Sequence, residues 1–266
     1  MSNGNIDDEW NPARVAEILL TAERSHTART SIQDEWPGLT LDVAYAAQDI
    51  ALADRKSRGE VVTGVKLGLT SRAKQQQMGV NEPSVAWLTD AMALPAGLPI
   101  PRDRLIHPRA EPEIAFVLGK PLSGPGVTAA QALSAVDYVV GAIEIIDSRY
   151  AGFRFTLADA VADNNSSGVY LTGPVTRSIA DVDLSMEACL MEVDGDIVDS
   201  ATGSAVLGHP AEALAFAANT FGARGVSLQP GWVVLTGGMT DAITVEPGSR
   251  VAAHFTSLGS VTVAGG

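Results

Sequence analysis

Residues 108–118, PRAEPEIAFVL, and residues 138–146, YVVGAIEII, are two strongly apolar stretches that carry three glutamates between them. Apolar runs of this length, rich in β-branched residues, predict two strands of a sheet. Side chains alternate between the faces of a strand, so Glu111 and Glu113 project to the same side. Glu144 stands among valines and isoleucines, where an unpaired ionised carboxylate would cost on the order of several kcal/mol.

Together the three carboxylates are typical of a divalent metal site. A cation removes the cost of burying them, and three carboxylates supply part of the octahedral oxygen shell of Mg²⁺ or Mn²⁺, with water and a chelating substrate completing it. Two simpler interpretations stay open. Glu-x-Glu pairs are common on solvated strand faces, and Glu144 could instead pair with an arginine such as Arg109 or Arg149.

From Val61 onward, short apolar runs separated by glycine, proline and aspartate continue the strand pattern to the C-terminus. Asp194 and Gly195 suit the primed turn of a hairpin. Helical patterns interrupt the strands at residues 128–138 and 210–221. These patterns predict an α+β fold built on a large mixed or antiparallel β-sheet.

The N-terminal region has a helical pattern instead. Asn11 followed by Pro12 predicts the start of one helix, and Thr40 predicts the cap of a second helix that ends near Gly59. We therefore expect two parts, an N-terminal helical arm at residues 1–59 and a β-rich catalytic domain at residues 60–266.

Composition narrows the class of ligand. The 266 residues carry a formal net charge of −13 at pH 7, which would repel nucleic acid or an anionic membrane, so we expect a small-molecule ligand. With Cys189 as its single cysteine and no signal-peptide pattern, the chain is expected to be cytoplasmic. Hydrophobic residues make up 46% of the chain, and this excess favours self-association into a homo-oligomer.

Lysines are scarce, and only Lys66 lies in an apolar, strand-like context, within residues 64–72, GVKLGLTSR. Its simplest structural interpretation is a side chain that lines the sheet edge while its ammonium reaches water. Its functional interpretation is a cation in an anion pocket. Nearby Gly68 allows close backbone approach, and Thr70 and Ser71 offer hydroxyl groups.

Six stretches resemble, in order and spacing over nearly the whole chain, the hydratase/decarboxylase family of aromatic meta-cleavage pathways, within the fumarylacetoacetate hydrolase-like superfamily. The resemblance implies that superfamily's sheet roll, an Mg²⁺ or Mn²⁺ cofactor and a small 2-oxo acid substrate. It implies Glu111, Glu113 and Glu144 as metal ligands and Lys66 as the catalytic lysine. The matched stretches are GVKLGLTS (64–71), LIHPRAEPEIAFVL (105–118), AIEIIDSRY (142–150), VADNNSSG (161–168), AVLGHP (205–210) and LTGGMT (235–240).

Four hydroxyl residues within these stretches are predicted to bind the substrate. They are Thr70, Ser71, Ser166 and Thr236. A carboxylate at the far end of a substrate would need a cation or hydroxyls for orientation, and Arg154 or Arg72 could supply one.

The family contains two activities, and residues 79–88, GVNEPSVAWL, favour one of them. Hydratase-like sequences tend to carry aspartates in this segment, whereas Asn81 and Ser84 stand here, and only Glu82 remains nearby to manage protons. We therefore expect decarboxylation of 2-oxo-3-hexenedioate (4-oxalocrotonate) to 2-hydroxy-2,4-pentadienoate and CO₂. The alternative is hydration of that dienoate to 4-hydroxy-2-oxopentanoate.

Two further alternatives are weaker. C–C bond hydrolysis would need a base such as histidine near a water-positioning glutamate, and the N-terminal half of the sequence offers no clear candidate. A catalytically silent partner subunit would gain nothing from an uncompensated acidic cluster. The resemblance to the decarboxylases of this family also implies a complex with the pathway hydratase.

Pro112 departs from the family pattern, which more often has a small residue between the two glutamates. Proline cannot donate to a sheet ladder, so Pro112 predicts an edge position or a bulge.

Overall fold

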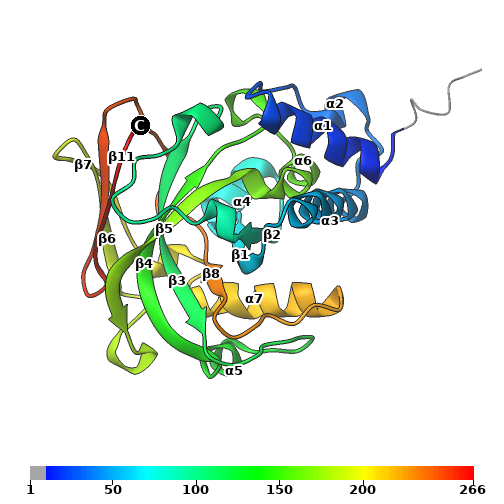
Figure 1. The fold of residues 1–266 in the computed structure, drawn as a ribbon. Coiled ribbons are helices and arrows are strands. Elements are labelled where there is room, and N and C mark those ends of the chain that lie inside the picture. Colours follow the sequence, from blue (N-terminus) through cyan, green and yellow to red (C-terminus); the bar gives the residue numbers. More distant parts are fainter. Residues whose placement is uncertain (1–9) are drawn as a thin grey trace, which may run out of the picture.

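A seven-stranded mixed sheet forms the centre of the fold in this computed structural model, which describes residues 10–266 (Figure 1). Its strand order is β2-β1-β8-β3-β4-β5, with β9 paired to β3. The β1–β8 pair is parallel and the other pairs are antiparallel. The strands are β1 (Val62–Gly68), β2 (Ser84–Thr89), β3 (Arg109–Leu118), β4 (Val136–Ile146), β5 (Ser167–Arg177), β8 (Val233–Leu235) and β9 (Ile243–Thr244).

A second, four-stranded antiparallel sheet packs beside the first, in the order β11-β10-β6-β7. The two sheets approach closely, because a Cβ added to Gly141 of β4 would lie 2.6 Å from the ring of Phe255 in β10. One hydrophobic cluster joins the inner faces of both. Its strands are β6 (Ala188–Val193), β7 (Asp196–Thr202), β10 (Arg250–Phe255) and β11 (Gly259–Ala264). The predicted α+β class with a large mixed sheet is confirmed.

The hairpin between β6 and β7 is confirmed as well. Asp194 and Gly195 both have positive φ values, 51° and 97°, as a primed turn requires.

Three N-terminal helices lie at the opposite end of the molecule from β7 (Figure 1). They are α1 (Pro12–Arg24), α2 (Ile32–Glu35) and α3 (Leu41–Ser57). Asn11 and Thr40 cap α1 and α3 as predicted. Their apolar side chains share a separate hydrophobic cluster with Tyr150 and with α6 (Leu157–Ala162), which belongs to the β-rich part. The division at residue 59 therefore stays a prediction, and α6 is where the two parts meet.

Of the two predicted internal helices, one has the predicted extent and the other does not. Helix α7 (Pro210–Ala223) starts at Pro210 and packs against the sheet. The helix predicted at 128–138 is wrong in its second half, because α5 spans only Ala129–Leu133 and β4 starts at Val136. β-Branched and aromatic side chains from Val136 onward pair with β3, and this pairing overrides the local helical pattern.

Pro112 lies in an interior strand, so the predicted edge position holds only locally. Strand β3 pairs with β4 along its whole length, but on its other side β9 covers Arg109 and Ala110, and β8 covers residues 115–117. Pro112 falls in the gap between β9 and β8. Its carbonyl accepts a bond from Met239 on that side, where no strand requires the missing N–H.

Among the helices of residues 10–266, none is both long enough and apolar enough to cross a lipid bilayer.

Candidate metal centre

The three glutamates converge on one point of the central sheet. Glu111 of β3 and Glu144 of β4 are direct cross-strand partners, and Glu113 lies two residues farther along the same face. One carboxylate oxygen from each residue lies within 4.8 Å of those of the other two. All three side chains are buried. The sequence predicted this convergence, and the role of the three residues as metal ligands stays a prediction.

The positive charge around the three carboxylates is too small to keep all of them ionised in the usual pH range. Burial, followed by the charges of Glu144 and Glu111, raises the pKa of Glu113 well above its usual range. Burial also raises the pKa of Glu144, against the opposing effect of Lys66. Glu113 Oε1 and Glu144 Oε2 are buried without a hydrogen-bond partner. Two such oxygens beside a third carboxylate fit a hard divalent cation, which prefers oxygen ligands.

Lys66 of β1 is the partner of Glu144. Its Nζ lies 2.6 Å from Glu144 Oε1 and donates to the backbone carbonyl of Asn165 at 2.9 Å. The side chain is only 3% exposed, which excludes the interpretation that its ammonium reaches water. Its two partners fix the ammonium at the edge of the acidic cluster.

The stretch LTGGMT supplies space and a donor for the acids. The N–H of Gly237 donates to Glu113 Oε2 at 2.7 Å. A Cβ on Gly238 would lie 2.7 Å from the carboxylate carbon of Glu111, so only glycine leaves that carboxylate its present position. These two glycines therefore shape the acidic cluster without contributing a side chain.

Lys74 is a part of the site that sequence reasoning missed. It lies on the short helix α4 (Arg72–Met78), and its Nζ is 2.7 Å from Glu111 Oε1 and 3.2 Å from the carbonyl of Thr240. Burial is the largest single influence and lowers the pKa of Lys74, but the charge and hydrogen bond of Glu111, together with the charges of Asp241 and Glu113, make the net shift upward. The segment RAKQQQM has no apolar periodicity, so the scarcity of lysines was the one signal that could have singled it out.

A cavity of about 140 Å³ opens beside the acids. Lys66, Lys74 and Glu111 line its polar side, and Ile146, Phe153, Phe155 and Ala160 line its apolar side. Thr70 and Ser166, two of the predicted substrate-binding residues, also line it. Its size and mixed walls suit a small organic acid.

The other two predicted substrate-binding residues lie outside this lining. Ser71 is the residue that precedes α4. Thr236 is fully buried, and its hydroxyl donates to the carbonyl of Ile114 at 2.7 Å. Their roles in substrate binding stay predictions.

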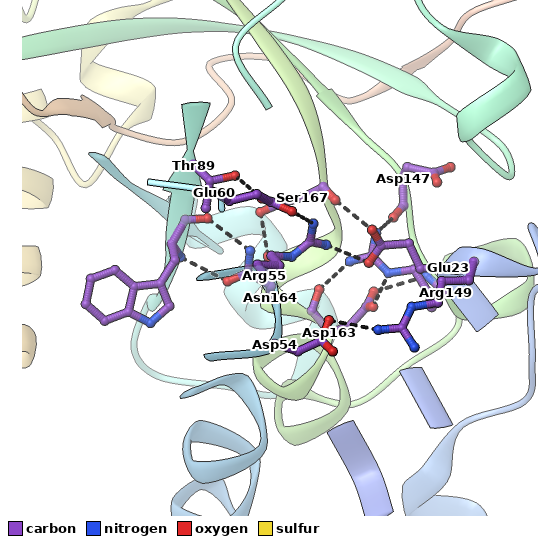
Figure 2. Close-up of polar contacts among 12 residues, drawn as sticks. Glu23, Asp54, Arg55, Glu60, Thr89, Asp147, Arg149, Asp163, Asn164 and Ser167 are labelled. Atoms are coloured by element: carbon purple, nitrogen blue, oxygen red, sulfur yellow. Dashed lines mark hydrogen bonds and ion pairs between the residues drawn. The ribbon is translucent and has the colours of Figure 1, made fainter. Parts of the chain in front are cut away.

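A buried polar network holds the loop that supplies Asn165 (Figure 2). The Arg149 guanidinium pairs with the Asp163 carboxylate and donates to the carbonyls of Asp147 and Ser167 at 2.6 and 2.9 Å. Asn164 exchanges two hydrogen bonds of 2.9 Å with the backbone of Trp87. Residues 164–166 all have positive φ values, a backbone conformation that is unfavourable for residues other than glycine. The network therefore holds a strained loop against Lys66.

Among residues 10–266, no arginine forms an ion pair with Glu144, whose partner is Lys66. Arg149 is committed to Asp163, and the guanidinium of Arg109 lies 4.1 Å from the centre of the Phe153 ring. Arg72 and Arg154, considered for a distal carboxylate, are exposed and are not part of the cavity lining.

Two known proteins are similar to this chain over most of its length. The 4-oxalocrotonate decarboxylase of Pseudomonas sp. (strain CF600) is 39% identical over 252 residues, which cover 92% of this chain and 96% of that protein. The 2-keto-4-pentenoate hydratase of Burkholderia vietnamiensis is 38% identical over 256 residues, with coverage of 96% and 98%.

A solved structure is similar over nearly the whole fold. The 4-oxalocrotonate decarboxylase from Pseudomonas putida G7, complexed with magnesium and adipate, superposes with a TM-score of 0.91 at 36% identity, covering 96% of this chain and 98% of that one. The family model "Fumarylacetoacetate (FAA) hydrolase C-terminal" matches residues 61–264. The chain therefore belongs to the fumarylacetoacetate hydrolase family, as the resemblance of its motifs predicted.

Proposed function

We propose that this protein is a lyase that decarboxylates 2-oxo-3-hexenedioate to 2-hydroxy-2,4-pentadienoate and CO₂, using Mg²⁺ or Mn²⁺. The observation that carries the proposal is the cluster of three buried carboxylates with Lys66 at its edge and a cavity for a small acid beside it. The similarity to 4-oxalocrotonate decarboxylases over most of the chain supports the same activity.

The chain's residues suit the electron flow of this reaction. Glu111, Glu113 and Glu144 would hold the ion, which supplies a Lewis acid that polarises the 2-oxo group of a chelated 2-oxo acid. When the C5–C6 bond breaks, its electron pair moves through the conjugated chain to the C2 oxygen, and the distal carboxylate leaves as CO₂. A proton delivered to that oxygen completes the product.

Lys66 has the role of stabilising the charge that develops at C2. Its ammonium is fixed by Glu144 and the Asn165 carbonyl before the substrate arrives, so it needs no reorganisation during the reaction. Burial of the lysine excludes water and strengthens its electrostatic effect.

Hydration of 2-hydroxy-2,4-pentadienoate is the second candidate, because relatives named hydratases match at similar identity. A hydratase needs an acid–base group close to the substrate. Among the described residues, Glu111 is the only acid in the cavity lining, and the exposed Glu82 lines a different pocket. This arrangement favours decarboxylation.

Two substrates separate these candidates. The purified protein with Mg²⁺ is supplied first with 2-oxo-3-hexenedioate, and CO₂ is measured. It is then supplied with 2-hydroxy-2,4-pentadienoate, and 4-hydroxy-2-oxopentanoate is measured. We expect only the first substrate to react, and reaction of the second alone would establish the hydratase instead.

We also propose that the protein is a cytoplasmic homo-oligomer that forms a complex with the pathway hydratase. Exposed apolar side chains on and beside the β6–β7 hairpin, Met186, Leu190, Ile197 and Val198, support self-association. Light scattering of the purified chain tests this proposal, and a monomer at all concentrations would contradict it.

A further inference from the structure

We infer that Lys74 binds the distal carboxylate of the substrate and so gives the site its preference for dicarboxylates over monocarboxylates. This inference rests on the proposed function. It assigns the two ends of the substrate to two binding points: the 2-oxo acid end binds at the metal centre, and the second carboxylate binds at Lys74.

Position singles out Lys74 among the chain's cations. Among the described residues, Lys66 and Lys74 are the two cationic side chains that line the cavity. Lys66 is already paired within the acidic cluster, since its ammonium is buried between Glu144 and the Asn165 carbonyl. Lys74 is the cation left for a second carboxylate.

The ammonium of Lys74 has a donor available for a ligand. Of its three N–H groups, one is directed to Glu111 Oε1 and one to the carbonyl of Thr240, the two acceptors within hydrogen-bond distance. The side chain is 25% exposed, compared with 3% for Lys66, so a substrate can reach it. Its flexible four-carbon stem allows the ammonium to follow a ligand in the cavity.

The charge of a second substrate carboxylate is not compensated at the metal centre, and Lys74 can compensate it. The three carboxylates, the Lys66 ammonium and a doubly charged ion together have no net charge. A dicarboxylate then adds two negative charges to a cavity whose remaining walls include the apolar rings of Phe153 and Phe155. Leaving the second carboxylate unpaired there would be costly, and Lys74 supplies the nearest compensating charge.

A ligand of the related decarboxylase is consistent with this substrate class. The Pseudomonas putida G7 structure was determined with magnesium and adipate, a six-carbon dicarboxylate. A protein that superposes on this chain with a TM-score of 0.91 therefore binds a dicarboxylate.

Two non-reacting ligands of equal chain length test the inference. Binding of 2-oxohexanedioate and of 2-oxohexanoate, which lacks the distal carboxylate, is measured by calorimetry in the presence of Mg²⁺. We expect the wild-type protein to bind the dicarboxylate more tightly. In Lys74→Met, affinity for the dicarboxylate should fall by about 10- to 100-fold, the range of one charge-assisted hydrogen bond, while affinity for the monocarboxylate should change little.

The matched control is Arg72→Gln, which removes a positive charge from the same helix at an exposed position outside the cavity. It should leave the dicarboxylate preference intact. Mg²⁺ titration without ligand provides a second readout: Lys74 competes with the ion for Glu111, so Lys74→Met should bind Mg²⁺ at least as tightly as the wild type. Lys74→Gln replaces Lys74→Met if the latter does not fold.

A preference for the dicarboxylate that persists in the Lys74 variant, or an equal loss in Arg72→Gln, would overturn the inference. Its failure is separable from that of the proposed function. If the wild-type protein decarboxylates the substrate and the Lys74 variant keeps the dicarboxylate preference, only the proposed function is supported. A Lys74-dependent preference without decarboxylation would sustain the inference alone.

Discussion

At the scale of single residues, Lys66 shows how one buried charge can serve two purposes. It balances Glu144 at 2.6 Å, and it presents a fixed ammonium to the cavity. The sequence singled it out because a lysine in an apolar strand needs a partner, and its partner proved to be one of the predicted ligands.

Replacing Lys66 with methionine tests its role. Lys66→Met keeps the length of the side chain but removes the charge, and turnover should fall by about 10²–10³, the usual effect of losing one placed electrostatic group. Turnover and circular dichroism are measured with Mg²⁺ present, with Lys120→Met as control, since Lys120 is exposed. Near-normal turnover by Lys66→Met would refute its catalytic role.

Gly238 should be sensitive to a single added methyl group. In Gly238→Ala the new Cβ would lie 2.7 Å from the carboxylate carbon of Glu111, and this flexible side chain would move rather than the backbone. We expect an intact fold with Mg²⁺ affinity lower by about 10- to 100-fold, as for other residues that orient a ligand. Calorimetric titration with Mg²⁺ measures this change, and an unaltered affinity would show that Glu111 is not a ligand.

Metal affinity should depend on pH through Glu113. Burial and the neighbouring carboxylates raise the pKa of Glu113, so the folded, metal-free chain retains a proton that an exposed glutamate would have lost. An ion requires the ionised form, so binding releases this proton. Mg²⁺ affinity should therefore rise with pH and level off above the raised pKa. Titrations in buffers of different ionisation enthalpy measure the protons released, and pH-independent affinity would contradict this account.

At the scale of elements, strands were predicted more reliably than the connections that complete the site. The strands carrying Lys66 and the three glutamates follow from apolar patterning, because each buries a full face. Helix α4 and the loop at residues 164–166 could not be predicted in this way. Their positions depend on partners distant in the sequence, such as the contact of Lys74 with Glu111 and of Asn164 with Trp87.

The Arg149–Asp163 pair should be the main support of that loop. In Asp163→Asn the buried guanidinium loses its charged partner, and the free energy of unfolding should fall by about 3–5 kcal/mol. Denaturant unfolding measures the change, with the exposed Asp196→Asn as control. A loss no greater than in the control would mean that the network in Figure 2 does not stabilise the fold.

At the scale of the whole molecule, the α+β class, the mixed sheet and the convergence of the three glutamates were predicted from the sequence. The second sheet as a separate layer and the contact between α6 and the N-terminal helices became known only from the structure. Both depend on packing between distant segments. Gly141 illustrates this limit, since its role is to admit the ring of Phe255 from the other sheet.

Metal binding should stabilise the whole fold. An ion that binds only the folded chain adds about 2.7 kcal/mol to the free energy of unfolding at a concentration one hundred times its Kd. Mg²⁺ should thus raise the Tm, and EDTA should reverse the effect. Glu113→Gln, which lacks one carboxylate, should show a much smaller shift.

The most direct test of the account is the location of a metal ion in crystals of the protein grown with Mn²⁺. Anomalous diffraction identifies manganese without reference to the protein model. We predict one strong site coordinated by Glu111, Glu113 and Glu144, with the Lys66 ammonium adjacent to it. No manganese at this position, or the three carboxylates each paired with a separate cationic side chain, would contradict the account.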